Sequence, residues 1–269
     1  MSHGISPWRP NQHGAWAMLI APAVAGTLAA VVAHPAPKHT ATIAAILIAW
    51  FTGYFAFFAF GLAAKARTPQ RRRHYAAPIA VYGPLSLAGM AAALLLQPQL
   101  TWWAIAFAPL VGIAVWETLR GRPRSFASGA STTVASALLV PVLYAAARGL
   151  TPAQLPAHVY LACLFLALYF TGTIPVVKSM IRERNNPGYV RFSVGFHVAA
   201  LVVFLAAWAG IGRLIPAAMA ALLAVALWRA WWIPHTRTQG RVWTAKQIGK
   251  FESPFVSAAT VLVIAALVI

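Results

Sequence analysis

Long apolar stretches alternate with short, mostly basic connections along the whole chain. An apolar segment of about 20 residues can cross the hydrocarbon core of a bilayer as a helix. The pattern therefore predicts an all-α, polytopic membrane helical bundle with about nine transmembrane helices, forming a single integral membrane domain over residues 1–269. The predicted spans are residues 14–33, 40–64, 79–96, 102–117, 129–147, 156–177, 193–211, 214–233 and 254–269.

The positive charges are distributed very unevenly between the two ends of these spans. Of the 21 Lys and Arg residues, 18 fall on the side of the N-terminus, and only Lys38, Arg148 and Arg213 fall on the other side. Because cytoplasmic loops carry the excess of Lys and Arg, we predict a cytosolic N-terminus and a C-terminus outside. One miscounted helix would scramble this asymmetry, so it also supports nine spans.

Acidic residues are almost absent, and this limits the chemistry. The chain has no aspartate, and its three glutamates are Glu117, Glu183 and Glu252. Most Mg²⁺, Ca²⁺ and acid–base sites need several carboxylates, so we expect no cofactor and consider Mg²⁺ unsuited to this chain. No two histidines are spaced four apart on a predicted helix, and we expect His197 to be a buried, hydrogen-bonded residue rather than a metal or haem ligand. Glu252 precedes the last span, where we expect it to cap that helix.

The net charge of +18 accompanies a composition that is 61% hydrophobic. This combination is typical of a membrane protein and not of a basic soluble domain, so no nucleic-acid partner is expected. Basic residues next to the membrane attract anionic head groups, which makes membrane lipids the expected partners.

The tripeptide Phe-Thr-Gly occurs twice, at residues 51–53 and 170–172, near the cytosolic ends of the second and sixth spans. A basic loop ending in tyrosine follows each copy, at Tyr75 and Tyr189. The shared position indicates a parallel internal repeat of helices one to four and five to eight. Such a repeat would bring the second and sixth loops together above the bundle.

Several polar residues at the cytosolic ends form the candidate site. Lys178 and Arg182 are four residues apart and share a helical face, so with their neighbours they make a cluster suited to phosphate, pyrophosphate or carboxylate. Glu117 has the spacing to pair with Arg120. A salt-bridged loop beneath lipid head groups is the structural alternative. The candidate ligand-binding residues are Gln12, His13, Arg73, Tyr75, Glu117, Arg120, Lys178, Arg182, Glu183 and Arg184; no catalytic residue is assigned.

Two resemblances add to this interpretation. The segments Pro10–Met18, Thr171–Thr173 and Val177–Arg184 resemble the YwiC-like family of bacterial membrane proteins. That resemblance covers essentially the whole chain and implies the bacterial cytoplasmic (inner) membrane, without an activity. More weakly, Arg9–Gln12 and Leu119–Gly129 are similar to the UbiA superfamily of intramembrane prenyltransferases, which implies a UbiA-like bundle over a lipid cavity.

The UbiA resemblance lacks one element, the Asp-rich motifs that hold Mg²⁺ on a prenyl pyrophosphate. The corresponding stretches, residues 60–73 and 173–186, contain no aspartate. We therefore expect an anionic head group, of an isoprenoid or other phosphorylated lipid, to bind at a basic cytosolic mouth, with Mg-dependent transfer lost or rewired. The alternatives are an active prenyltransferase that uses Arg and Lys in place of Mg²⁺, a small-anion transporter or channel, and an assembly protein. No buried charge pair is recognised that would mark a transport pathway.

Overall fold

The computed structural model describes residues 6–10, 13–209, 214–238 and 243–268. Over these residues all regular structure is helical, with two short 3₁₀ turns, η1 (Pro98–Trp103) and η2 (Pro152–Gln154). The α-helices are α1 (His13–Val32), α2 (Pro37–Ala63), α3 (Pro69–Leu96), α4 (Ala104–Leu119), α5 (Phe126–Arg148), α6 (Ala157–Ile181), α7 (Pro187–Trp208), α8 (Leu214–Thr238) and α9 (Ala245–Val268). This part of the chain holds nine helices long and apolar enough to cross a membrane, which confirms the predicted polytopic bundle.

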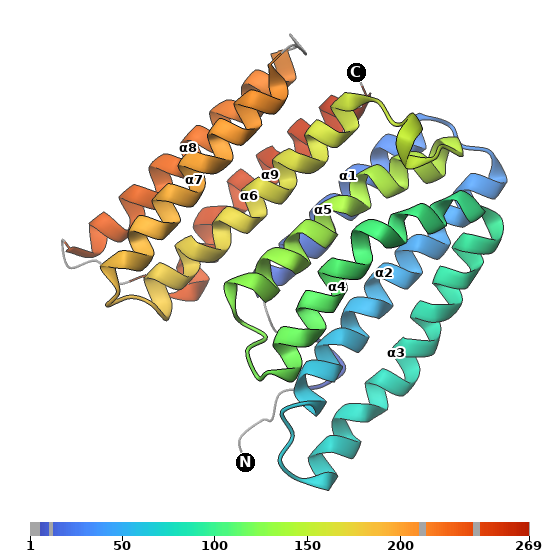
Figure 1. Cartoon of the computed structure of the whole chain (residues 1–269), viewed down its shortest axis with the longest axis horizontal. Helices are drawn as coiled ribbons and strands as arrows, with labels where there is room; N and C mark the ends of the chain where they lie inside the picture. The colour runs from blue at the N-terminus through green and yellow to red at the C-terminus, as the bar shows by residue number, and fades with distance from the viewer. Residues whose placement is uncertain (1–5, 11–12, 210–213, 239–242, 269) are drawn as a thin grey trace.

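The helices lie side by side, with α7 and α8 at one edge and α2 and α3 at the other (Figure 1). Between the edges, α5 packs against α1, α4 and α6, while α6 also packs against α7 and α9. About three quarters of the α5 and α6 spans are buried, at 78% and 72%, against 11% of α3. The peripheral helices expose large apolar side chains such as Leu87, Leu95 and Ile105, which suits a surface that faces hydrocarbon.

The two Phe-Thr-Gly copies have the same packing role. A Cβ placed on Gly53 of α2 would come within 2.8 Å of the Ser86 hydroxyl oxygen on α3. A Cβ on Gly172 of α6 would come within 2.7 Å of His197 Nε2 on α7. In both helix pairs, the glycine therefore leaves room for a polar side chain of the helix that follows.

Several segments predicted as basic loops are helical. Pro69 begins α3, and the Thr68 hydroxyl caps it by accepting the Arg71 backbone N–H at 3.3 Å, so Arg73 and Tyr75 lie on the first turns of a helix. The predicted long loop over 234–253 is also mostly helix, because α8 continues to Thr238 and α9 begins at Ala245. Pro234 and Pro254 lie inside these helices, and neighbouring helices make such interior prolines tolerable in membrane spans.

Candidate functional site

Three turns of the bundle come together at one end. The α2–α3, α4–α5 and α6–α7 turns lie at the end of the bundle where α1 begins, and α9 finishes at the opposite end (Figure 1). We call the end that holds these three turns the basic end, because the turns carry Lys65, Arg124 and Arg182.

Lys65, Arg124 and Arg182 form a cationic cluster contributed by three different turns. All three are exposed. The pKa of Lys65 lies below its usual value, first because partial burial disfavours the charged ammonium and then because Arg124 and Arg182 repel it. Partial burial and Arg124 likewise lower the pKa of the Arg182 guanidinium. The folded chain thus holds three like charges within electrostatic range of one another, an arrangement that an anion would stabilise.

The nearby glutamates are engaged with other residues. Glu117 is buried and accepts a hydrogen bond from Arg122 Nη2 at 3.0 Å, so the predicted Glu117–Arg120 pair is wrong. Gly121, with a φ of 73°, reverses the chain and returns Arg122 to the carboxylate, whereas the Arg120 guanidinium lies 4.7 Å from the centre of the Trp116 ring. In the α6–α7 turn, Glu183 accepts a hydrogen bond from the Asn186 side chain at 3.2 Å.

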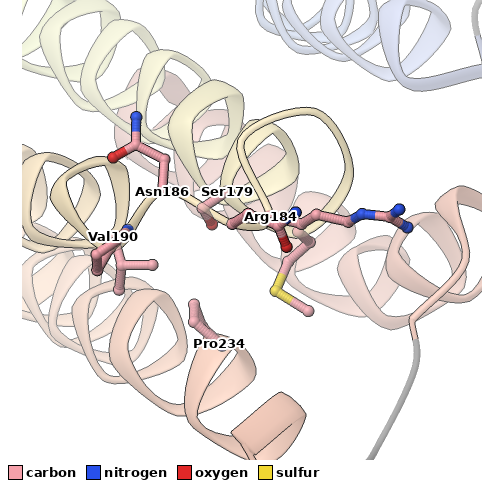
Figure 2. A pocket seen from close by; sticks show the side chains of 8 residues that line it. Ser179, Arg184, Asn186, Val190 and Pro234 are labelled. Carbon is pink, nitrogen blue, oxygen red and sulfur yellow. The ribbon is translucent and has the colours of Figure 1, made fainter.

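A pocket of about 340 Å³ opens beside the α6–α7 turn. Figure 2 shows Ser179 of α6, Val190 of α7 and Pro234 of α8 around it. Arg184 and Asn186 of the turn add polar side chains to a lining that also contains the apolar residues Met180 and Pro187. The volume of the pocket suits a small polar group.

The structure brings together only part of the predicted site. Arg182, Glu183 and Arg184 lie in the α6–α7 turn, which follows Lys178 in the last turn of α6. Lys178 Nζ lies 5.5 Å from the centre of the Tyr189 ring. Arg73 is exposed on α3, and Tyr75 is half-buried, with its ring 5.5 Å from that of His74. Gln12 lies outside the described residues, and of His13 only its place at the start of α1 is given.

Lys65 and Arg124 were not singled out from the sequence. Each lies just beyond a helix end, Lys65 after α2 and Arg124 before α5. The adjacency of a basic residue to the end of a span was the available signal, but it does not separate these two residues from the other arginines of the same turns.

A second polar group lies within the spans. Arg229 of α8 forms an ion pair with Glu252 of α9, and both residues are buried. Glu252 therefore does not cap α9, which begins seven residues earlier at Ala245. No buried charge pair was recognised in the sequence, and the structure contains this one. The apolar residues around Arg229 on α8 concealed it, since its partner is 23 positions away in the sequence.

Comparison with known proteins identifies the family. The model of the family described as YwiC-like protein matches residues 10–144. A Bacillus subtilis (strain 168) protein named "Uncharacterized protein YwiC" is 29% identical over 90% of this chain and 91% of its own length. A Haemophilus influenzae protein named "Uncharacterized protein" is 24% identical over 72% of this chain and 76% of its own. No solved structure matches the chain significantly. Because the family model matches half of the chain, the chain belongs to the YwiC-like family of proteins.

Proposed function

We propose that the protein binds a phosphate-bearing anionic head group at its basic end, through Lys65, Arg124 and Arg182. One observation carries the proposal: three different turns at the basic end each contribute one exposed cation, and these cations repel one another, while Glu117 and Glu183 are engaged with Arg122 and Asn186. A phosphate or pyrophosphate would relieve that repulsion, and guanidinium groups bind such oxyanions through paired hydrogen bonds.

The surroundings favour a head group that belongs to a lipid. The cluster lies at the ends of the helices. The adjoining helices expose large apolar side chains, on which an acyl or isoprenoid chain would lie. The pocket beside Arg184 and Asn186 adds polar lining on the same α6–α7 turn as Arg182. Because of the UbiA resemblance, an isoprenoid diphosphate is the first lipid to test, with free pyrophosphate as the matched soluble anion.

The test compares thermal unfolding of the purified, detergent-solubilised protein with and without each ligand. Wild-type protein should be stabilised by both, and Arg182→Gln should reduce that stabilisation because each charge-assisted contact contributes about 1.5–3 kcal/mol. Without ligand, Lys65→Gln should raise the unfolding temperature slightly, since it removes repulsion. Arg72→Gln is the control, an exposed arginine of α3 that should leave ligand stabilisation unchanged.

The distinguishing result is that Lys65→Gln changes the unfolding temperature in opposite directions, raising it without ligand and lowering it with ligand. A merely structural role for Lys65 would make Lys65→Gln destabilising with and without ligand. Equal losses of ligand-induced stabilisation in Arg182→Gln and Arg72→Gln would show that the basic turns attract head groups only in a general way, and this would refute the proposed site. A response to pyrophosphate but not to the lipid would assign the site to a soluble anion.

We further propose that this binding needs no Mg²⁺, because the segments corresponding to the Asp-rich motifs have no aspartate and cations already neutralise the anion. Ligand stabilisation should be the same in EDTA as in excess Mg²⁺. Loss of stabilisation on chelation, restored by adding Mg²⁺, would contradict this.

A further inference from the structure

The ion pair between Arg229 and Glu252 leaves hydrogen-bonding atoms of both side chains without a partner among the described residues. Arg229 Nη1 donates to Glu252 Oε2. Within the part of the chain that the structure describes, Nε and Nη2 of Arg229 and Oε1 of Glu252 have no hydrogen-bond partner. The two residues are only 1% and 9% exposed. Leaving such groups unsatisfied in a membrane interior costs free energy, and charged residues within spans usually mark a functional site.

Tyr169 of α6 approaches the same guanidinium. The Arg229 Cζ lies 5.9 Å from the centre of the Tyr169 ring. The Tyr169 hydroxyl is buried and lies close enough to Arg229 for a side-chain hydrogen bond between them to contribute to its electrostatics, although this contact falls outside standard hydrogen-bond geometry. A hydroxyl that can donate or accept thus adjoins the open side of the guanidinium.

His197 of α7 supplies an acceptor. Its Nδ1 lies 2.7 Å from the Ser193 carbonyl oxygen, and since a carbonyl only accepts, the proton of the neutral ring sits on Nδ1. Nε2 then carries a lone pair, is buried, and has no partner among the described residues. The ring lies within electrostatic range of Arg229, in the space left by Gly172, which is one helical turn after Tyr169.

The charges decide what such a site can accept. Arg229 and Glu252 cancel, and His197 is neutral, so a bare anion would leave a net negative charge buried in the membrane. Among the described residues of the other helices packed against these four, α1 has no ionisable side chain after His13, and α5 carries only Tyr144 and Arg148, both near its far end, so neither helix offsets that charge. An oxyanion that arrives with a proton keeps the cluster neutral. The Nε–Nη2 edge of Arg229 matches the two oxygens of a carboxylate, and His197 Nε2 is an unpaired acceptor for the proton.

We infer that α6, α7, α8 and α9 form a second, intramembrane site that binds a small carboxylate together with one proton. Arg229 and Tyr169 hold the oxygens, and His197 takes the proton. This site is separate from the cationic cluster of the basic end and does not depend on it.

The pocket at the basic end is lined by residues of the same helices α6, α7 and α8 that carry this site. Pro234 lies five residues from Arg229 on α8, and Val190 lies seven residues from His197 on α7, which corresponds to roughly 8 and 11 Å along a helix axis. The Ser193 hydroxyl lies between Val190 and His197, buried and without a partner among the described residues. Polar atoms therefore continue from the pocket toward the cluster.

Acetate is the probe, measured by thermal unfolding and calorimetric titration on the full chain in lipid nanodiscs, with chloride replacing acetate at constant ionic strength. Wild-type protein should bind acetate, and above neutral pH its apparent affinity should rise about tenfold per unit fall in pH, as linkage to one proton requires. Arg229→Lys keeps the positive charge but removes the paired N–H donors of the guanidinium. It should weaken acetate binding at least about tenfold. Tyr169→Phe should weaken binding without removing its pH dependence, and His197→Gln should remove the pH dependence.

Arg148→Lys is the matched control, because this arginine also lies against a tyrosine, with its Cζ 3.7 Å from the centre of the Tyr144 ring at the far end of α5. It should leave acetate binding unchanged. Absence of acetate binding to wild type, pH-independent binding, or equal losses for Arg148→Lys and Arg229→Lys would each overturn the inference. If Arg229→Lys fails to fold, Tyr169→Phe carries the same comparison.

The two sites can fail separately. Arg182→Gln should weaken pyrophosphate stabilisation and leave acetate binding intact, whereas Tyr169→Phe should do the reverse. Acetate binding that disappears in Arg182→Gln would place acetate at the basic end and refute the intramembrane site.

Discussion

At the scale of single residues, the partner of Glu117 depends on the backbone and not on sequence spacing alone. Arg120 has the spacing for a helical ion pair, but α4 ends at Leu119 and Gly121 takes a left-handed φ of 73°. The chain turns back, and Arg122 meets the carboxylate instead. The pairing could not be predicted, because a shift of two residues at a helix end changes which side chains face one another.

A double-mutant cycle tests this pairing. Glu117→Gln combined with Arg122→Gln should show a coupling of about 0.5–1 kcal/mol, small because the Arg122 side chain is exposed and solvent screens it. The same cycle with Arg120→Gln should show coupling near zero in thermal or denaturant unfolding. A larger coupling for Arg120 than for Arg122 would contradict the observed geometry.

At the scale of helices, hydrophobicity predicted where the spans lie but not where they end. A run of about 20 apolar residues can hardly be anything but a membrane helix, so all nine spans were found. The ends extend further because Arg73, Lys178 and other basic residues remain helical while reaching water, and because Pro234 and Pro254 do not stop α8 and α9. Proline and charge mark the ends of soluble helices better than those of packed membrane helices.

Helix packing in the α2–α3 pair depends on one small residue. A Cβ on Gly89 of α3 would lie 2.8 Å from the Ala45 carbonyl oxygen and 2.9 Å from the Ala49 nitrogen of α2. Both are backbone atoms, so the helices themselves would have to separate. Gly89→Ala should therefore destabilise the protein by about 1–3 kcal/mol, measured by thermal unfolding in detergent.

Gly83→Ala is the control for this substitution, because no atom lies within 4 Å of a Cβ at that position of α3. It should be neutral or slightly stabilising, since alanine favours a helix over glycine. Similar losses at the two positions would show that the close contact between α2 and α3 does not limit stability.

At the scale of the whole molecule, the convergence of the turns could be predicted better than the residues that meet there. Charge alternation and the Phe-Thr-Gly repeat placed the α2–α3, α4–α5 and α6–α7 turns at one end. Lys65 and Arg124 lie within electrostatic range of Arg182 in the structure, where Arg73 and Arg120 were expected. Which cations of neighbouring turns lie close together depends on the helical phase of each helix end, and that is set by packing rather than composition.

The orientation in the membrane stays a prediction, and reporter fusions test it. A reporter active only outside the cytoplasm should work when fused after Ile269 and fail when fused before Met1. The physical reason is the concentration of Lys and Arg at the basic end. Activity at the N-terminus, or its loss at the C-terminus, would reverse or break the proposed arrangement.

The Arg229–Glu252 pair also has a consequence for biosynthesis. The ribosome makes α8 before α9, so the arginine leaves the insertion machinery before its partner exists. A charge at the centre of an isolated span opposes insertion by about 2.5–3.5 kcal/mol, and by less toward the ends of the span. Arg229 lies past the midpoint of α8 and Glu252 lies two turns into α9, so each helix alone carries part of this cost. Together they form a hairpin whose charges cancel, so α8 and α9 should enter the bilayer as one unit. In a nascent chain that ends before α9, α8 should therefore insert into the bilayer less efficiently.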